Sequence, residues 1–341
     1  MTGLHLLPSD SGRPTLKTIA AETGLAIATV SRALKDAPDI GEETKRRVRE
    51  TAERLGYRPN RAGVRLRTGK TNVIALTLST ETDVMNHTSR LIYSIAEALR
   101  GSAYHLVVMP FFADQDPMDP VRYLVETESA DGIILNQTRP DDPRVRYLAE
   151  HRFPFATHGR TEMGIDHPYF DFDNAAFSHV AVTALARRGR KNLLLVPPPS
   201  SQNYSRHMQD GFLAGATALG LQARVMTGTH SDSGAAQVEA AVADWLRRDP
   251  AVDGLIAGST TAAMAAVAGA ESIGRVIGRD FDLASKEAIT FLHRFRKEII
   301  VFEEDVGRAG TFLARAVMAA IERRAPDQGQ FLDRPTELTQ T

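Results

Sequence analysis

The stretch that decides the fold of the N-terminal part is TLKTIAAETGLAIATVSRAL, residues 15–34. Its apolar residues recur every three to four positions on both sides of Gly24, which predicts one helix over 16–22 and another over 27–34. Thr15 can cap the first helix, and Gly24 can take the positive φ that the turn between them requires. Two short helices joined by a glycine-containing turn are typical of a helix-turn-helix.

Two further segments follow this pair. Residues 42–55 predict a third helix whose buried stripe is Val48, Ala52 and Leu55, and which Gly56 ends. Residues 60–67, NRAGVRLR, are too short to form a stable helix alone, and Gly63 lowers their helix propensity further. The sequence therefore predicts an all-α domain followed by a marginal helix or linker.

The charges are unevenly distributed along the chain. Residues 1–71, called the head below, carry fourteen Lys and Arg against eight Asp and Glu, whereas the 341-residue chain as a whole has a net charge of −1. A basic head on an acidic body indicates that the head meets a polyanion such as DNA. The alternative is an ordinary solvated helix surface.

The rest of the chain, called the body below, alternates strand and helix patterns. Strands are predicted at 72–79, 105–109, 132–135, 153–157, 192–196, 223–226, 254–257 and 275–278, and helices at 89–100, 177–188, 207–219, 235–247 and 261–273. This alternation, given twice, predicts an α/β body of two doubly wound parallel-sheet lobes. Ligands of such folds bind beyond the carboxyl ends of the strands, so a cleft between the lobes is expected.

Several function classes find no support in the sequence. Its 43% hydrophobic and 24% charged residues are typical of globular proteins, and it has no cysteine for a disulfide, thiolate metal site or nucleophile. Nucleotide-binding glycine motifs, a Gly-x-Ser-x-Gly elbow and metal-ligand histidine spacing are missing. We therefore expect neither an enzyme nor a metal or cofactor. Residues 1–14 do not have the order of a signal peptide, which favours the cytoplasm.

Motifs within residues 15–71 occur in the order and spacing of one known family. They are Thr15-Leu-Lys-Thr-Ile-Ala, Gly24, Thr29-Val-Ser-Arg32, Thr44, Gly56-Tyr57-Arg-Pro59-Asn60 and Leu66-Arg67. On these residues the head resembles the DNA-binding domain of the lactose-repressor (LacI/GalR) family. The resemblance implies a DNA-binding transcriptional regulator, a repressor by expectation, whose second helix enters the major groove and whose third helix braces it.

The resemblance also assigns the DNA contacts. Ile27 and Ala28 match the positions that choose the base sequence, and as apolar residues they can touch thymine methyl groups. Arg32 matches the base-reading arginine and can bridge O6 and N7 of guanine. The other matching residues are expected to fix docking on phosphates and base edges: Thr15, Thr29, Ser31, Thr44, Tyr57 and Asn60.

The resemblance also concerns two helix N-cap positions and the linker after the third helix. Ala26 and Gly41 stand where the family usually has a serine cap, and an alanine cap costs on the order of 1 kcal/mol. In the family the segment after the third helix is a hinge that becomes helical on DNA. Leu66 matches its minor-groove wedge, with Arg65 beside it. The alternative is a plain flexible linker.

The body resembles the same family, whose core looks like a periplasmic sugar-binding protein. The matching motifs are Asp131-Gly132-Ile133-Ile134, Asp173-Asn174, Gly211-Phe212 and Gly278-x-Asp280. By analogy we expect a helix-turn-helix domain over 1–59, a hinge and linker over 60–72, and a two-lobed ligand-binding and dimerisation core over 73–341. The first lobe would be about 73–173 and 301–326, and the second about 174–300 and 327–341.

Candidate ligand residues follow from the expected strand ends and from the resemblance. Asp280 matches the family's effector-binding aspartate, and a carboxylate can accept two hydroxyl hydrogen bonds. The family's effector arginine is replaced by Met208, so Arg206 is the expected substitute. The remaining candidates are Asn136, His158, Arg160, Phe111, Asp173 and Ser259. We expect a sugar or sugar derivative in the cleft.

Two functions of different classes remain open from the sequence. The first is a homodimeric regulator that binds a double-stranded operator and is controlled by a small carbohydrate. The second is a solute-binding or sugar-modifying body with an incidental helical head. The basic head and the hinge pattern favour the first. Because no C-terminal leucine heptad occurs, we expect a dimer rather than a tetramer.

Overall fold

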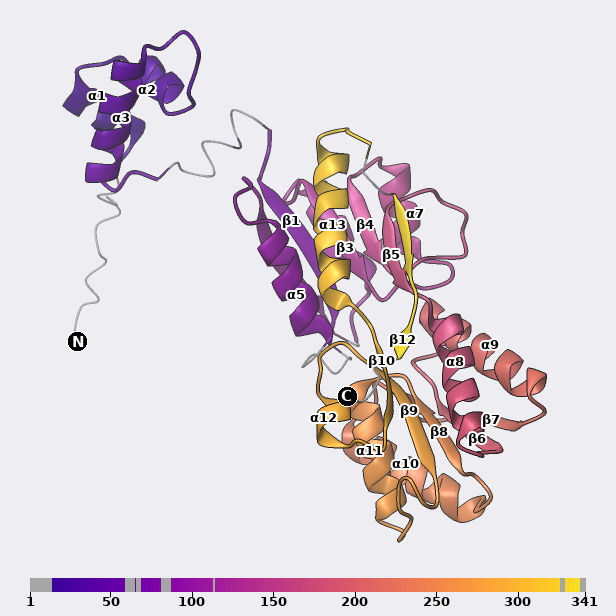
Figure 1. Cartoon of the computed structure of the whole chain (residues 1–341). Helices are drawn as coiled ribbons and strands as arrows, with labels where there is room; N and C mark the ends of the chain where they lie inside the picture. The colour runs from indigo at the N-terminus through magenta and orange to yellow at the C-terminus, as the bar shows by residue number, and fades with distance from the viewer. Residues whose placement is uncertain are drawn as a thin grey trace, which may run out of the picture. The chain divides into compact units, whose positions relative to one another are not determined.

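The structure, a computed structural model, describes residues 14–58, 65, 69–80, 87–112, 114–325 and 329–337. The chain divides into two compact units at the junction of Thr71 and Asn72, which correspond to the head and the body (Figure 1). The predicted hinge residues Asn60 and Leu66 lie outside the described residues. Within the described residues, no helix is both long and apolar enough to span a membrane.

The described head consists of α1 (Leu16–Thr23), α2 (Ile27–Ala33) and α3 (Glu42–Arg54). Ile19, Val30 and Val48 bring one fully buried side chain from each helix to a common core. Gly24 ends α1 at a φ of +67°, which confirms the predicted turn and the helix-turn-helix.

The first lobe of the body is a parallel sheet in the order β11-β5-β4-β3-β1-β2. Helices pack around it, and α13 runs along its face beside α5 (Figure 1). The strands are β1 (Val73–Ser79), β2 (His105–Phe111), β3 (Gly132–Asn136), β4 (Phe155–His158), β5 (Tyr169–Phe172) and β11 (Gln330–Asp333). The helices are α5 (His87–Ala98), α6 (Met118–Glu126), α7 (Pro143–Glu150) and α13 (Val306–Ile321).

The second lobe repeats this plan in the order β12-β10-β9-β8-β6-β7, with only the β10–β12 pair antiparallel among its described strands. Its strands are β6 (Asn192–Val196), β7 (Gln222–Val225), β8 (Gly254–Ala257), β9 (Asp282–Glu287), β10 (Ile300–Glu303) and β12 (Thr336–Glu337). Its helices are α8 (Asn174–Arg187), α9 (Asn203–Ala218), α10 (Ala235–Arg248), α11 (Thr260–Glu271) and α12 (Leu292–Phe295). The predicted fold of two parallel-sheet lobes is confirmed.

The predicted lobe boundaries need two corrections. The second crossing follows β10, at 304–305 rather than at 300, because β10 pairs with β9 of the second lobe. The C-terminal segment is shared between the lobes: β11 pairs with β5 of the first lobe, and only β12 joins the second. Phe331 of β11 stacks on the buried Phe170 at 5.1 Å, so aromatic packing holds this strand in the first lobe.

The predicted strand at 275–278 is wrong. Gly278 has a φ of +82°, which is incompatible with a strand, and residues 275–281 form turns with a single bridge between Ile277 and Phe281. The strand of this region is β9, whose six residues are all buried despite their polar sequence DLASKE. Asp280 therefore precedes a strand instead of following one.

Close packing of α8 on α9 depends on a glycine. A Cβ atom at Gly211 would lie 2.1 Å from the carbonyl oxygen of Ala175, so no other residue fits without moving the backbone. The contact packs the first turn of α8 against the middle of α9, and the first turns of these helices bring Asn174 and Tyr204 to the pocket between the lobes.

Candidate functional site

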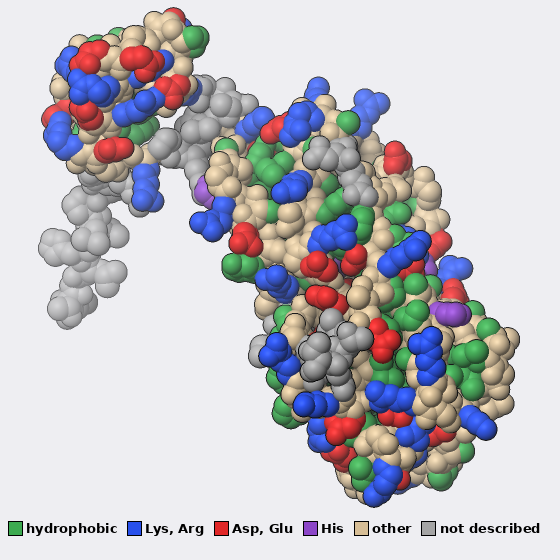
Figure 2. Space-filling model, in the orientation of Figure 1, with side chains coloured by type: hydrophobic (Ala, Val, Ile, Leu, Met, Phe, Trp, Pro, Cys, Tyr) green, Lys and Arg blue, Asp and Glu red, His purple; other side chains and the backbone are tan. Residues whose placement is uncertain are grey.

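Helix α2 exposes the side chains that were predicted to read bases. Ile27 is 43% exposed, Ala28 and Arg32 are also exposed, whereas Val30 and Ala33 are fully buried against the other helices. In the structure Arg32 forms an ion pair with Asp39. Acidic and basic side chains alternate over the visible face of the head (Figure 2).

The other predicted DNA residues are placed as follows. Thr15 caps α1, accepting a hydrogen bond from the backbone N–H of Thr18. Thr29, Ser31, Thr44 and Tyr57 are half-buried, and Arg65 is exposed. The carbonyl of Arg65 accepts a hydrogen bond from the Gly69 amide at 2.8 Å.

The two predicted cap defects are present. Ala26 and Gly41 occupy the N-cap positions of α2 and α3 in extended conformation, and neither helix has a side-chain cap hydrogen bond. The first turn of the helix that carries Arg32 therefore lacks the capping bond that Thr15 supplies to α1.

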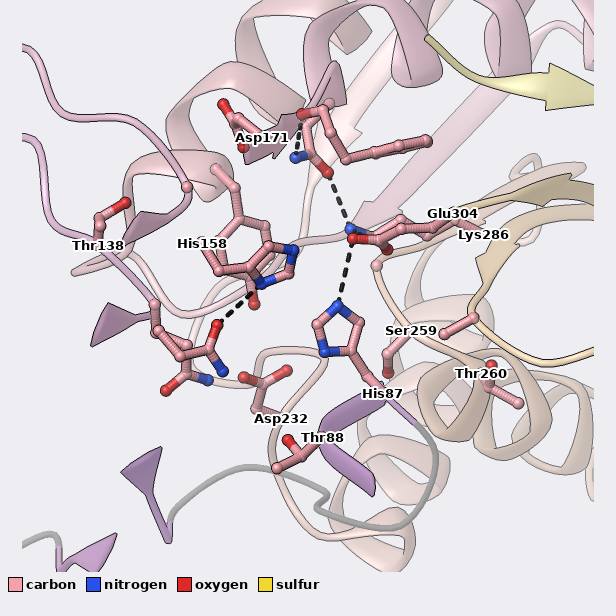
Figure 3. Close-up of a pocket in the computed structure, with 18 of the residues that line it drawn as sticks. His87, Thr88, Thr138, His158, Asp171, Asp232, Ser259, Thr260, Lys286 and Glu304 are labelled. Atoms are coloured by element: carbon pink, nitrogen blue, oxygen red, sulfur yellow. Dashed lines mark hydrogen bonds and ion pairs between the residues drawn. The ribbon is translucent and has the colours of Figure 1, made fainter. Parts of the chain in front are cut away.

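A pocket lies in the body where the carboxyl ends of the two sheets meet (Figure 3). Asn136 and His158 end strands of the first lobe, whereas Lys286 lies near the end of β9 in the second. The other lining residues are His87, Thr88, Gln137, Thr138, Gly159, Arg160, Asp171, Phe172, Asn174, Tyr204, Asp232, Gly258, Ser259, Thr260, Thr261, Ala288 and Glu304. Both lobes thus contribute polar groups to one cavity.

The pocket contains half of the ligand residues suggested by the sequence, namely Asn136, His158, Arg160 and Ser259. The other four, Asp280, Arg206, Asp173 and Phe111, do not line the pocket.

Asp280 lies before β9, at the end opposite to the pocket, where its carboxylate binds Arg279 and the Val276 amide. Arg206 is an exposed residue of α9 that lies 3.9 Å from Asp210. Asp173 caps α8, and Phe111 ends the edge strand β2.

An ion-pair network crosses the pocket. The Lys286 ammonium lies 2.9 Å from Glu304 Oε2 and donates to Asn174 Oδ1 at 3.0 Å, while Glu304 Oε1 lies 3.3 Å from His87 Nε2. Burial alone would raise the pKa of Glu304, but Lys286 and His87 outweigh it and hold that pKa well below its ordinary value. Glu304 therefore stays a carboxylate inside the pocket.

Two further carboxyl groups line the cavity. Burial raises the pKa of Asp171 to about 7, although Arg160 Nε lies 3.3 Å from its Oδ2 and opposes the shift. Burial also raises the pKa of Asp232, whose Oδ1 accepts from Ser231 Oγ at 2.9 Å. The Oδ2 atoms of both aspartates are buried and have no hydrogen-bond partner. Such atoms are satisfied when a donor enters.

A hydrogen bond to Asn136 fixes the tautomer of His158. Its Nδ1 lies 3.0 Å from Asn136 Oδ1, and because that oxygen accepts, Nδ1 carries the proton and Nε2 is an acceptor. Burial lowers the pKa of His158 to about 3, with the nearby His87 adding to the shift, so the ring is neutral. The pocket can therefore bind hydroxyl groups through carboxylate, imidazole and amide partners.

Two family models match the chain. Residues 83–287 match the periplasmic binding proteins and sugar binding domain of the LacI family, and residues 15–60 match the bacterial regulatory proteins of the lacI family. The chain belongs to the LacI family.

Individual LacI-family proteins resemble the chain over different lengths. The transcriptional regulator RafR of Escherichia coli is 35% identical over 209 residues, and the match covers 61% of this chain and 62% of RafR. A lac repressor dimer bound to operator and the anti-inducer ONPF superposes with a TM-score of 0.84, at 17% identity over 96% of this chain and 98% of that one. A CelR–cellobiose complex superposes with a TM-score of 0.70 at 21% identity, and the match covers 96% of this chain and 99% of that one.

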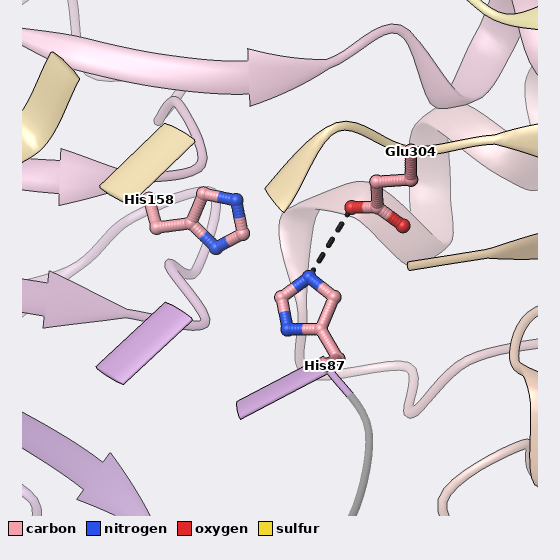
Figure 4. A group of neighbouring side chains, drawn as sticks. All are labelled: His87, His158 and Glu304. Atoms are coloured by element: carbon pink, nitrogen blue, oxygen red, sulfur yellow. Dashed lines mark hydrogen bonds and ion pairs between the residues drawn. The ribbon is translucent and has the colours of Figure 1, made fainter. Parts of the chain in front are cut away.

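One group in this LacI-family pocket has the composition of a metal site. The ligand atoms of His87, His158 and Glu304 all lie within 4.8 Å of one another (Figure 4). Two imidazoles and a carboxylate are a ligand set that Zn²⁺ accepts. However, Lys286 already places a positive charge beside Glu304, at 2.9 Å. The geometry fits a hydrogen-bonding group better than a metal centre.

Sequence reasoning missed the charged residues at the centre of the pocket, Asp171, Asp232, Lys286 and Glu304. Asp171 and Lys286 lie inside strands, where charged residues are rare unless they are paired. A charge near the end of a buried strand was the signal that could have found them.

Proposed function

We propose that this LacI-family chain is a repressor that binds a double-stranded operator as a homodimer and is controlled by a small carbohydrate bound between the lobes of its body. The observation that carries the proposal is the pocket itself, which both lobes build from hydroxyl-binding groups. The pocket lies at the switch point where doubly wound folds bind their ligands.

The exposed face of α2 supports the DNA-binding half of the proposal. Ile27 and Ala28 can contact thymine methyl groups, and Arg32 can bridge a guanine once DNA displaces Asp39. A helix that buries Val30 and Ala33 and exposes these three residues has the division of faces that a reading helix needs.

The composition of the pocket supports a carbohydrate. Its walls combine the aromatic residues Phe172 and Tyr204 with acceptors such as Asp232 and Asn136. The CelR–cellobiose complex, which has the same fold, supports a disaccharide as the kind of ligand.

The network through Lys286 supports control by the ligand. Lys286 and Asn174 belong to the second lobe, His87 to the first, and Glu304 to the segment that crosses between them. A sugar that binds among these groups changes the relative energies of open and closed lobes, which is the basis of control by a ligand.

The test is a gel-shift assay of the full chain on DNA from upstream of its own gene, with random DNA of equal length as the control. The proposal expects specific retardation that changes when a sugar which raises the melting temperature of the protein is added. A chain that binds sugars but shows no preference for any upstream DNA would instead support a solute-binding protein.

A further inference from the structure

We propose that the pocket selects uncharged sugars and excludes their phosphorylated and carboxylated forms, with Asp171 and Asp232 as the residues that discriminate. The inference rests on the proposed carbohydrate control and names the class of sugar within it. It follows from which polar atoms of the pocket already have partners and which do not.

Both cationic side chains of the pocket lining are already paired. Lys286 lies 2.9 Å from Glu304 Oε2 and donates to Asn174 at 3.0 Å. Arg160 lies 3.3 Å from the Asp171 carboxylate. An incoming phosphate would have to break one of these buried pairs, and the carboxylate left behind would then be buried without its counter-ion.

The buried side-chain atoms without partners in the lining are acceptors. Asp232 Oδ2 and Asp171 Oδ2 are buried and accept no hydrogen bond, although Arg160 Nε forms an ion pair with Asp171 Oδ2 at 3.3 Å. Rotation about the last side-chain bond exchanges the two oxygens of each carboxyl group, so either can face the cavity. Sugar hydroxyl groups are donors that can satisfy them, whereas ionised phosphate or carboxylate groups offer only further acceptors.

The sign of the lining charge favours the same ligand. The lining has three carboxyl groups, Asp171, Asp232 and Glu304, against the cations Lys286 and Arg160 and the imidazole of His87, and the buried His158 is neutral. Burial raises the pKa of Asp171 and Asp232, so Glu304 is the group most firmly held as a carboxylate. A phosphate would bring about two further negative charges close to these carboxylates. Like charges placed together in a desolvated site are strongly unfavourable.

Helix N-termini are the features of the pocket that could attract an anion. Helices α11, α8, α9 and α5 all begin at its wall. The first two have an internal side-chain cap, whereas α9 has none and its Asn203 amide donates to the Thr138 carbonyl at 2.9 Å instead. Ser259 Oγ accepts from the Ala262 amide at 3.2 Å, and Asp173 Oδ1 accepts from the Ala176 amide at 3.0 Å. The Asp173 carboxylate, in addition, repels an anion approaching α8. The capped ends of α11 and α8 therefore do not favour an anion, and in α9 the Thr138 carbonyl already occupies the first amide.

The experiment measures binding of matched ligands to the full-length protein by calorimetry. The panel contains glucose, galactose and cellobiose, the 6-phosphate and the uronic acid of each monosaccharide, cellobiose phosphate, and glucosamine. We expect at least one neutral sugar to bind, and its phosphorylated and acidic forms to bind at least about tenfold more weakly.

The variants Asp171→Asn and Asp232→Asn keep the shape of the side chain and remove its charge. Each should weaken binding of the neutral sugar about tenfold or more, because a hydrogen bond to a charged acceptor is lost. Each should also reduce the difference in affinity between the neutral sugar and its phosphorylated form. Asp210→Asn, on the exposed face of α9, is the matched control and should change neither quantity.

The outcomes distinguish failure of the charge selectivity from failure of the proposed carbohydrate control. A phosphosugar or uronic acid that binds more tightly than its neutral parent overturns the charge selectivity and leaves carbohydrate control intact. Tighter binding of glucosamine than of glucose would show that the carboxylates select a cation, which also overturns it. If no member of the panel binds while operator binding persists, both the selectivity and the proposed carbohydrate control fail.

Discussion

Lys286 Nζ lies 2.9 Å from Glu304 Oε2 and thereby ties the end of strand β9 in the second lobe to the segment that leads into the first lobe. Both side chains are about 8% exposed. The pair is part of the pocket wall, so the groups that hold the lobes together electrostatically are the groups that a ligand would touch. We therefore expect stability and ligand response to be coupled through it.

Replacing one member of this pair should destabilise the body. Lys286→Met leaves the Glu304 carboxylate buried without its main counter-ion, which costs about 3–5 kcal/mol. Urea unfolding of the full chain, followed by circular dichroism, measures the change. Arg324→Met is the control, because it breaks only the exposed pair with Glu322 and should cost less than about 1 kcal/mol. Equal losses in the two variants would show that the Lys286 pair contributes no more than a surface pair.

Sugar affinity should depend on pH through Asp171. In the unliganded protein the pKa of Asp171 is about 7, and hydroxyl groups that donate to its carboxylate lower that pKa in the complex. The bound state therefore holds fewer protons, and affinity rises as the pH increases toward 7 and levels off above it.

Calorimetric titration of a binding neutral sugar between pH 5.5 and 8.5 measures this dependence. Asp171 faces Arg160, Lys286, Glu304 and Asp173. The variant Asp171→Asn separates the contribution of Asp171 from those of the other four groups, and it should remove most of the dependence of sugar affinity on pH. An affinity that falls over the same pH range would mean that protonated Asp171 donates to the sugar.

Capping α2 should stabilise the head. Ala26 has the extended backbone of an N-cap but gives no side-chain hydrogen bond, so Ala26→Ser supplies the missing acceptor and should stabilise the helix by about 1 kcal/mol. Hydrogen exchange of the α2 amides in the full chain should slow about fivefold. Thr15→Ala is the reciprocal variant and should accelerate exchange in α1. Unchanged exchange in both would show that capping does not limit the opening of these helices.

Two variants distinguish base recognition by Arg32 from the general effect of its positive charge on DNA affinity. Arg32→Ala should weaken operator binding by about 1–3 kcal/mol per half-site while changing affinity for random DNA only slightly. Arg46→Ala removes the same charge from α3, where it pairs with Glu43 and Glu50, and is the control. Fluorescence anisotropy on both DNAs measures the effect, and equal weakening on both by Arg32→Ala would assign this residue to phosphate contact.

The head was predictable from sequence because its signals are local. The periodicity of residues 15–34 and the positive φ available at Gly24 specify two helices and a turn without reference to distant residues. The burial of Val30 and Ala33 follows from the same periodicity. Ile27 has the spacing of that apolar side as well, so its exposure was expected only from the resemblance.

The pocket was predictable only in part, because burial of a charge depends on strand pairing between distant segments. Asn136 and His158 follow apolar strands and were found. Lys286 lies inside the polar-looking strand DLASKE, and Asp171 is the one charged residue of the strand YFDF. The burial of Asp171 depends on β11, which comes from far along the chain, and that of Lys286 on pairing with β10. Asp280 was misplaced because a strand was expected before it, where Gly278 adopts a positive φ.

A neutral sugar bound in the body is expected to control operator binding by the head. The most direct measurement is the affinity of the full chain for its upstream DNA, by fluorescence anisotropy, with and without a saturating neutral sugar. We predict at least about a fivefold change for the wild-type protein, and a requirement for a much higher sugar concentration in Asp232→Asn. Identical operator affinity with and without a sugar that demonstrably occupies the pocket would show that the sugar does not control DNA binding.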